Sequence, residues 1–144
     1  MLTVLQEEQR PEDAEKRSNA ARRRVLVVDD NADAAISLAM MLKLAGNDVR
    51  TANDGVEAVE AATEYRPDVI LLDIGMPRLN GYDACRRIGE QPWGREPFIA
   101  ALTGWCQEDD KRRSRDAGFD SHLVKPVEPK ALQKLLDEVK VERA

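Results

Sequence analysis

Acidic residues stand where short apolar runs of this chain end, and that placement suggests metal or phosphoryl chemistry. Asp29 and Asp30 follow the apolar run 25–28, and Asp73 follows the apolar run 69–72. Three carboxylates that converge on one crevice repel each other unless they share a proton or hold a cation. Mg²⁺ suits an all-oxygen site that keeps several waters. The three residues are therefore predicted to hold Mg²⁺ loosely beside one reactive carboxylate.

Two further polar residues end later apolar runs. Thr103 follows the run 98–102, and Lys125 follows the run 119–124. A transferring phosphoryl group carries its charge on three oxygens, so its catalysis consists mostly of positioning and neutralisation. The Thr103 hydroxyl can help to position such a group by donating a hydrogen bond, and the Lys125 ammonium group can neutralise its charge. The five residues together favour phosphoryl transfer to a carboxylate.

The elements that must position these residues follow from the alternation of short apolar runs with segments of helical periodicity. Five strands are predicted, at 25–28, 48–52, 69–72, 98–102 and 119–124, and each is followed by a helical segment. Parallel strands need crossover connections, and the crossovers place helices on the sheet faces. The fold class is therefore a doubly wound α/β domain with a parallel sheet, whose ligands bind outside the carboxyl ends of the strands.

Three helical segments carry specific expectations. In the segment after Asn31, six residues are predicted to form the apolar face: Ile36, Leu38, Met40, Met41, Leu42 and Leu44. A helix over 79–87 follows the loop after Asp73. A charged helix over 107–117 has a thin apolar face, and we expect it to be the least stable helix.

Composition narrows the classes of partner. The 144 residues contain 22 Lys and Arg against 27 Asp and Glu, a formal charge of −5, which has the wrong sign for a general grip on nucleic acid. No stretch approaches the roughly 20 apolar residues of a membrane span, so no membrane partner and a cytoplasmic location are predicted. Cys85 and Cys106 form no C-x-x-C pair and are expected to be reduced and structural. Residues 1–23 are rich in both charges and poor in large apolar groups, which predicts a flexible extension.

Five motifs together resemble the receiver domain of bacterial two-component response regulators. They are Val25-Leu26-Val27-Val28-Asp29-Asp30, Asp68-Val69-Ile70-Leu71-Leu72-Asp73-Ile74-Gly75-Met76-Pro77, Asn80-Gly81, Ala101-Leu102-Thr103-Gly104 and Val124-Lys125-Pro126. The resemblance covers residues 24–142 and implies a flavodoxin-like fold with strand order 2-1-3-4-5. Because residues 24–142 would fill one receiver domain, we expect a lone receiver domain with no output domain.

The resemblance implies a role for each site residue. Asp29 and Asp30 map to the Mg²⁺-binding pair, and Asp73 maps to the phosphoacceptor, which also binds the metal. Gly75 would offer its backbone carbonyl to the ion.

The remaining roles concern the phosphoryl group and the switch. Thr103 takes the place of the switch hydroxyl, and Lys125 takes that of the lysine that pairs with the phosphoryl oxygens. His122 stands at the second switch position, where the family usually has Tyr or Phe.

The function implied is that of a single-domain response regulator, not a classical enzyme. Asp73 would accept a phosphoryl group from a sensor or hybrid histidine kinase or a phosphotransfer protein, and the product would signal by binding an unidentified downstream protein. One alternative is a receiver-like docking module that acts without phosphorylation. The other is an aspartyl-phosphate phosphohydrolase, but that class needs a second acid two residues after its nucleophile, where this chain has Gly75.

Overall fold

The sheet of this protein has the predicted order. In the computed structural model, which describes residues 23–74, 81–104, 112 and 115–139, five strands form one sheet in the order β3-β2-β4-β5-β6. The strands are β2 (Arg24–Val28), β3 (Asp48–Ala52), β4 (Val69–Asp73), β5 (Phe98–Thr103) and β6 (Ser121–Val124). Every neighbouring pair is parallel. Counted along the chain, the order is 2-1-3-4-5, which confirms the prediction.

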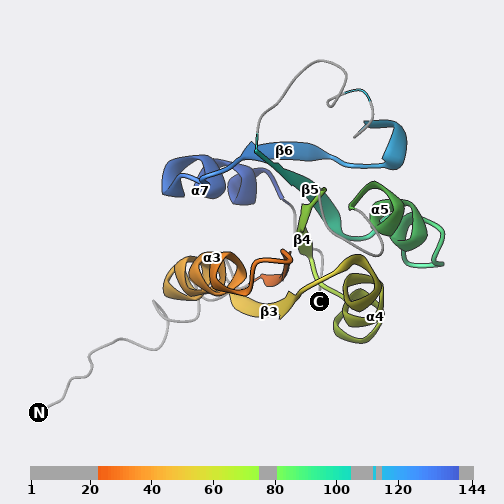
Figure 1. The fold of residues 1–144 in the computed structure, drawn as a ribbon, viewed down its shortest axis with the longest axis horizontal. Coiled ribbons are helices and arrows are strands. Elements are labelled where there is room, and N and C mark those ends of the chain that lie inside the picture. The colour runs from red at the N-terminus through yellow and green to blue at the C-terminus, as the bar shows by residue number, and fades with distance from the viewer. Residues whose placement is uncertain (1–22, 75–80, 105–111, 113–114, 140–144) are drawn as a thin grey trace, which may run out of the picture.

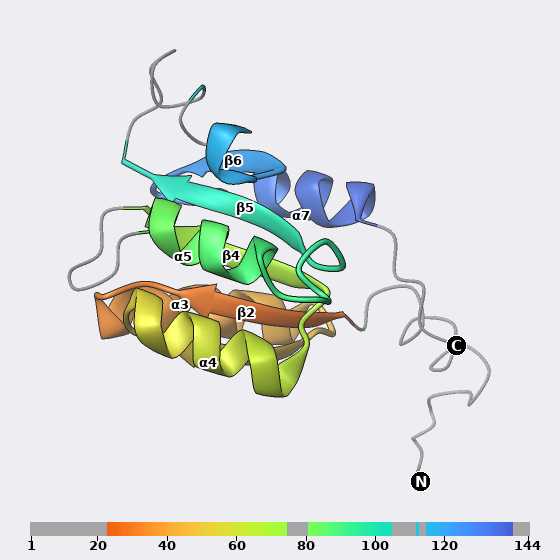
Figure 2. The ribbon, with the colours of Figure 1, turned by 90° about the vertical axis from the view of Figure 1, so that its right-hand side faces the viewer.

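Helices cover both faces of the sheet, as predicted. They are α3 (Ala32–Leu44), α4 (Gly55–Tyr65), α5 (Gly81–Gly89) and α7 (Pro129–Glu138). Figures 1 and 2 show α4 and α5 on one face and α3 and α7 on the other. Of the helix predicted over 79–87, residues 79–80 lie outside the described residues, residues 81–87 are helical, and the helix continues to Gly89. Of the helix predicted over 107–117, only residues 112 and 115–117 are described, and these are helical.

The described residues form two hydrophobic cores, one on each face of the sheet. Leu26 and Val28 of β2 face the core beneath α4 and α5, whereas Val25 and Val27 face the core beneath α3 and α7. All four side chains are fully buried. A strand segment that is buried on both faces must be apolar at every position, which is why residues 25–28 of β2 and 69–72 of β4 form unbroken apolar runs.

The predicted apolar face of α3 is wrong in part. Its buried residues are Ala35, Leu38, Ala39 and Leu42, while Ile36, Met40 and Leu44 are 53%, 59% and 88% exposed. Two alanines on the buried face let α3 lie close to the sheet. Ile36 and Met40, which directly follow these alanines in the sequence, consequently lie on the outer side of α3.

Side-chain caps start the helices directly after the strands. Asn31 Oδ1 accepts a hydrogen bond from Ala34 N, and Asp54 Oδ1 accepts one from Glu57 N. Each cap satisfies a backbone donor that has no partner within its helix. The strand-to-helix connections are therefore short, and they keep the site residues close to the sheet.

Some expectations lie outside the described residues. They concern residues 1–22 of the predicted extension, Gly75 and Cys106. Cys85 is buried, as expected for a structural cysteine. Within the described ranges, no helix combines the length and the apolar character that crossing a membrane requires.

Candidate functional site

The predicted site residues meet at the carboxyl edge of the sheet. Asp73 and Thr103 are the last residues of β4 and β5, and Asp29 and Lys125 directly follow β2 and β6. The backbone pairing continues past the strand ends, because Asp29 N donates to Ala52 O (3.1 Å) and Lys125 N donates to Thr103 O (2.8 Å). The rigid sheet therefore sets where these side chains start.

Three carboxylates form the acidic cluster. One carboxylate oxygen from each of Asp29, Asp30 and Asp73 lies within 4.8 Å of the other two. Asp29 is buried, with 2% of its surface exposed, whereas Asp30 is exposed. The cluster thus offers hard oxygen ligands with one side open to water, which fits Mg²⁺.

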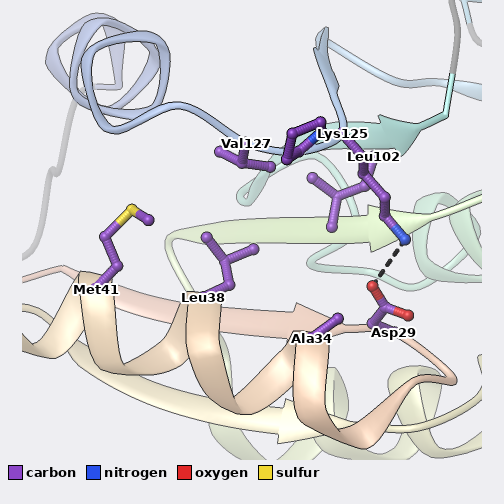
Figure 3. A pocket seen from close by; sticks show the side chains of 8 residues that line it. Asp29, Ala34, Leu38, Met41, Leu102, Lys125 and Val127 are labelled. Carbon is purple, nitrogen blue, oxygen red and sulfur yellow. Dashed lines mark hydrogen bonds and ion pairs between the residues drawn. The ribbon is translucent and has the colours of Figure 1, made fainter.

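Lys125 bridges two members of the acidic cluster. Its Nζ donates to Asp29 Oδ2 (2.8 Å) and to Asp73 Oδ2 (3.1 Å), as Figure 3 shows for Asp29. Burial disfavours the ammonium form, but the hydrogen bonds to the two carboxylates outweigh it and raise the pKa of Lys125. The lysine is therefore charged at neutral pH, and it offsets one of the three negative charges.

The carboxylate of Asp29 is held at both of its oxygens. Its Oδ1 accepts a hydrogen bond from Asn31 N (2.9 Å), while its Oδ2 receives the lysine. Both oxygens are therefore engaged inside the protein. Asp30 lies on the open side of the cluster, where a bound ion would meet solvent.

Thr103 and His122 lie on the same face of the sheet. In the β5–β6 register, Ala101 pairs with His122 and Thr103 pairs with Val124. Side chains alternate between the faces of a strand, so Thr103, His122 and Val124 share the face that α4 and α5 cover. Thr103 is buried and His122 is half-buried. This placement is compatible with the two switch roles, which stay predictions.

Gly81 packs against the backbone of Asp73, a contact that the sequence did not predict. A Cβ on this residue would lie 2.4 Å from the backbone oxygen of Asp73 and 2.5 Å from Ile74 Cα. Gly81 N also donates to Ile74 O (3.3 Å). Only glycine lets α5 begin so close to Asp73. The Asn80-Gly81 pair was the available signal, since it falls at the start of a predicted helix.

An apolar groove lies beside Lys125. It holds a cavity of about 200 Å³ between α3 and the segment after β6, and Figure 3 shows its walls. Leu38 and Met41 project from α3, and Leu102 and Val127 face them. Asp29 and Lys125 close the end of the groove nearest the acidic cluster. The cavity is below the roughly 300 Å³ at which small-molecule pockets begin, so it fits one or two side chains better.

Comparisons with known proteins agree with this geometry. The transcriptional regulatory protein PrrA of Mycobacterium tuberculosis is 43% identical over 103 residues, which cover 72% of this chain and 43% of PrrA. The chain thus spans less than half of that relative. The chemotaxis protein CheY4 of Vibrio cholerae superimposes with a TM-score of 0.79 at 33% identity, over 83% of this chain and 99% of CheY4.

A second solved structure concerns the metal. The receiver domain of the sensor histidine kinase PA1611 of Pseudomonas aeruginosa matches with a TM-score of 0.74 at 36% identity, over 80% of this chain and 94% of that one. That structure has a magnesium ion coordinated in its active-site cleft. The family model of the response regulator receiver domain matches residues 25–137. The chain therefore belongs to the family of response regulator receiver domains.

Proposed function

We propose that this protein is a phosphorylation-dependent switch that accepts a phosphoryl group on Asp73. Receiver domains are signalling domains rather than classical enzymes, and the finer assignment concerns which residues act here. The observation that carries it is the acidic cluster of Asp29, Asp30 and Asp73 with Lys125 bonded to two of its members. This is the arrangement that an acyl-phosphate site needs.

Asp73 is assigned the role of nucleophile. Its carboxylate oxygen would attack the phosphorus of a phosphohistidine, so that an O–P bond forms as the N–P bond to the imidazole breaks. Mg²⁺ held by the acidic cluster would screen the carboxylates and orient the phosphoryl oxygens. Asp29 and Asp30 are assigned as its side-chain ligands, with the Gly75 carbonyl as a further predicted one. The donor is a sensor or hybrid histidine kinase or a phosphotransfer protein.

Lys125 and Thr103 are assigned to the charge that phosphorylation brings. An acyl phosphate carries close to two negative charges at neutral pH. Lys125 already reaches Asp73 Oδ2 at 3.1 Å, so a small movement of its ammonium group would let it pair with a phosphoryl oxygen. The Thr103 hydroxyl would donate to another oxygen. Movement of Thr103 would open space on the face that it shares with His122, which is assigned the second switch position.

The apolar groove supports docking of the donor protein. It opens next to Lys125 and Asp29, so an apolar side chain placed there would hold a phosphohistidine near Asp73. The downstream partner is proposed to bind the β6 side, where Val124 is 50% exposed on the face of His122. Absence of a nucleic-acid partner and a cytoplasmic location stay predictions. So does the lone-domain organisation, since PrrA is a transcriptional regulator of greater length.

The proposal is tested by phosphorylation with a small phosphodonor. The full chain is incubated with acetyl phosphate and Mg²⁺, and intact-mass spectrometry is expected to show one added phosphoryl group. Asp73→Asn should abolish the addition, while Asp83→Asn, an acid on the exposed side of α5, should leave it unchanged. Labelling that survives Asp73→Asn would refute the assignment. No labelling of the wild type would favour the docking module that acts without phosphorylation.

A further inference from the structure

The side chain of Asn53 connects β3 to the loop that carries the acidic pair. Its Nδ2 donates to the backbone oxygen of Asp29 at 3.2 Å. The Asp29 amide in turn donates to the backbone oxygen of Ala52 at 3.1 Å. Asn53 thus adds one more hydrogen bond between the two chain segments, beyond the point where the β2–β3 pairing stops.

This hydrogen bond acts on Asp30 through the peptide plane. The peptide that joins Asp29 and Asp30 is planar, so holding the Asp29 carbonyl also orients the amide of Asp30 and restricts its Cα. The Asp30 carboxylate is exposed and makes no hydrogen bond or ion pair with any other residue in the described ranges. By contrast, the Asp29 carboxylate is held by Lys125 and by the Asn31 amide. The backbone is therefore the main restraint on where the Asp30 carboxylate lies.

Asn53 is itself held by the first turn of α4. Glu57 Oε1 accepts a hydrogen bond from Asn53 N (3.2 Å), and Glu57 N donates to Asp54 Oδ1 (2.8 Å). This exchange is a variant of the capping box, in which the helix start and the residues before it satisfy each other's donors. The orientation of Asn53 is therefore fixed by a helix end rather than by a free loop.

We propose that Asn53 is a positioning residue for the metal site. Its amide holds the peptide between Asp29 and Asp30, so that the exposed Asp30 carboxylate loses less freedom when it meets the ion. Asn53 thereby sets the affinity for Mg²⁺ without touching either the ion or the phosphoryl group. The inference rests on the proposed function, because it requires that the acidic cluster binds Mg²⁺.

The test is a titration of the full chain with Mg²⁺. The amide NMR shifts of residues 29–31 report the binding and give the dissociation constant. In Asn53→Ala the dissociation constant for Mg²⁺ is expected to rise about three- to tenfold, the range that corresponds to one net hydrogen bond. The Mg²⁺ concentration that gives half-maximal phosphorylation should rise by the same factor. The maximal rate at saturating Mg²⁺ should stay at the wild-type value. Asn53→Gln, which keeps the amide on a longer arm, should recover part of the affinity.

Thr51→Ala is the matched control, since Thr51 is an exposed residue of β3, two positions before Asn53, and the dissociation constant of this variant for Mg²⁺ should not change. An unchanged constant in Asn53→Ala would overturn the proposal. So would a loss of maximal rate, because it would show general damage to the site. A wild-type chain that binds no Mg²⁺ would refute the proposed function itself and this inference with it, so the two failures are distinguishable.

Discussion

Replacing Asp30 by Asn is expected to stabilise the metal-free protein, although it removes a residue of the site. The acidic cluster brings three carboxylates within 4.8 Å of one another, and only Lys125 offsets them among the described residues. Asp30 therefore faces two negative charges and one positive charge. These charges sum to about one net negative charge. Replacing the Asp30 carboxylate by a neutral amide therefore removes its repulsion by that net charge.

The magnitude follows from the separation of the oxygens. Two unit charges at 4.8 Å interact by ~0.9 kcal/mol in bulk water and by ~3.5 kcal/mol at an effective dielectric constant of about 20. Asp30 is exposed, so solvent screening places its repulsion near the lower value. We expect Asp30→Asn to raise the free energy of unfolding by about 1 kcal/mol without metal. For a domain of this size, that corresponds to a rise in Tm of about 4 °C.

The assay is urea unfolding, carried out once in EDTA and once in saturating Mg²⁺. An ion that binds only the folded state stabilises it by about 2.7 kcal/mol at one hundred times its Kd. The wild type should gain this stabilisation, and Asp30→Asn should gain little of it, so the order of stability reverses when Mg²⁺ is added.

The control is Asp33→Asn, the same change in the first turn of α3. The Asp33 carboxylate interacts favourably with the N-terminus of α3. Its neutralisation should therefore destabilise the fold slightly, both in EDTA and in Mg²⁺. An Asp30→Asn protein that is less stable than the wild type in EDTA would refute the reasoning. It would mean that the carboxylates do not repel each other in the metal-free fold.

Three other perturbations test separate parts of the structure. Burial, followed by the charge of Asp120, raises the pKa of the Cys85 thiol to about 12, so the fold should lose stability as the pH rises from about 9 to 12. Chemical unfolding across that pH range should show a smaller loss of stability in Cys85→Ala than in the wild type. Equal losses would show that the Cys85 thiol does not cause the pH dependence. Gly81→Ala should destabilise by about 1 to 3 kcal/mol, because its Cβ would meet the backbone of Asp73, and should slow phosphorylation; a variant with wild-type stability and rate would show that the contact is relieved cheaply. His122→Ala should leave the phosphorylation rate unchanged and reduce the change in hydrogen exchange that phosphorylation causes in β6, whereas an undiminished change would remove His122 from the switch.

The strand ends were the predictable part of this molecule. Asp29, Asp73 and Lys125 could be placed together because each follows an apolar run, and parallel strands end at one edge of a sheet. The sequence pattern did not predict how Lys125 pairs with the acidic cluster. That Lys125 bonds to two acids at once depends on side-chain distances across the sheet, and nothing local encodes them.

The outer side of α3 shows a different limit. Apolar residues occur on both sides of this helix, so periodicity alone did not decide which of them face the core. The choice depends on how closely the helix approaches the sheet, which the small Ala35 and Ala39 allow. Asn53 was missed because it is an ordinary loop residue whose role arises only from the neighbouring strand.

The long sequence separation within the site has a consequence for synthesis of the chain. Lys125 pairs with Asp29 across 96 positions and with Asp73 across 52. A ribosome-bound chain that has emerged only through β4 already carries all three acids, but it lacks the strand that delivers their positive partner. Asp73, the proposed acceptor, would therefore become competent only after β6 has joined the sheet. A kinase that needs this lysine would act on finished molecules and ignore nascent ones.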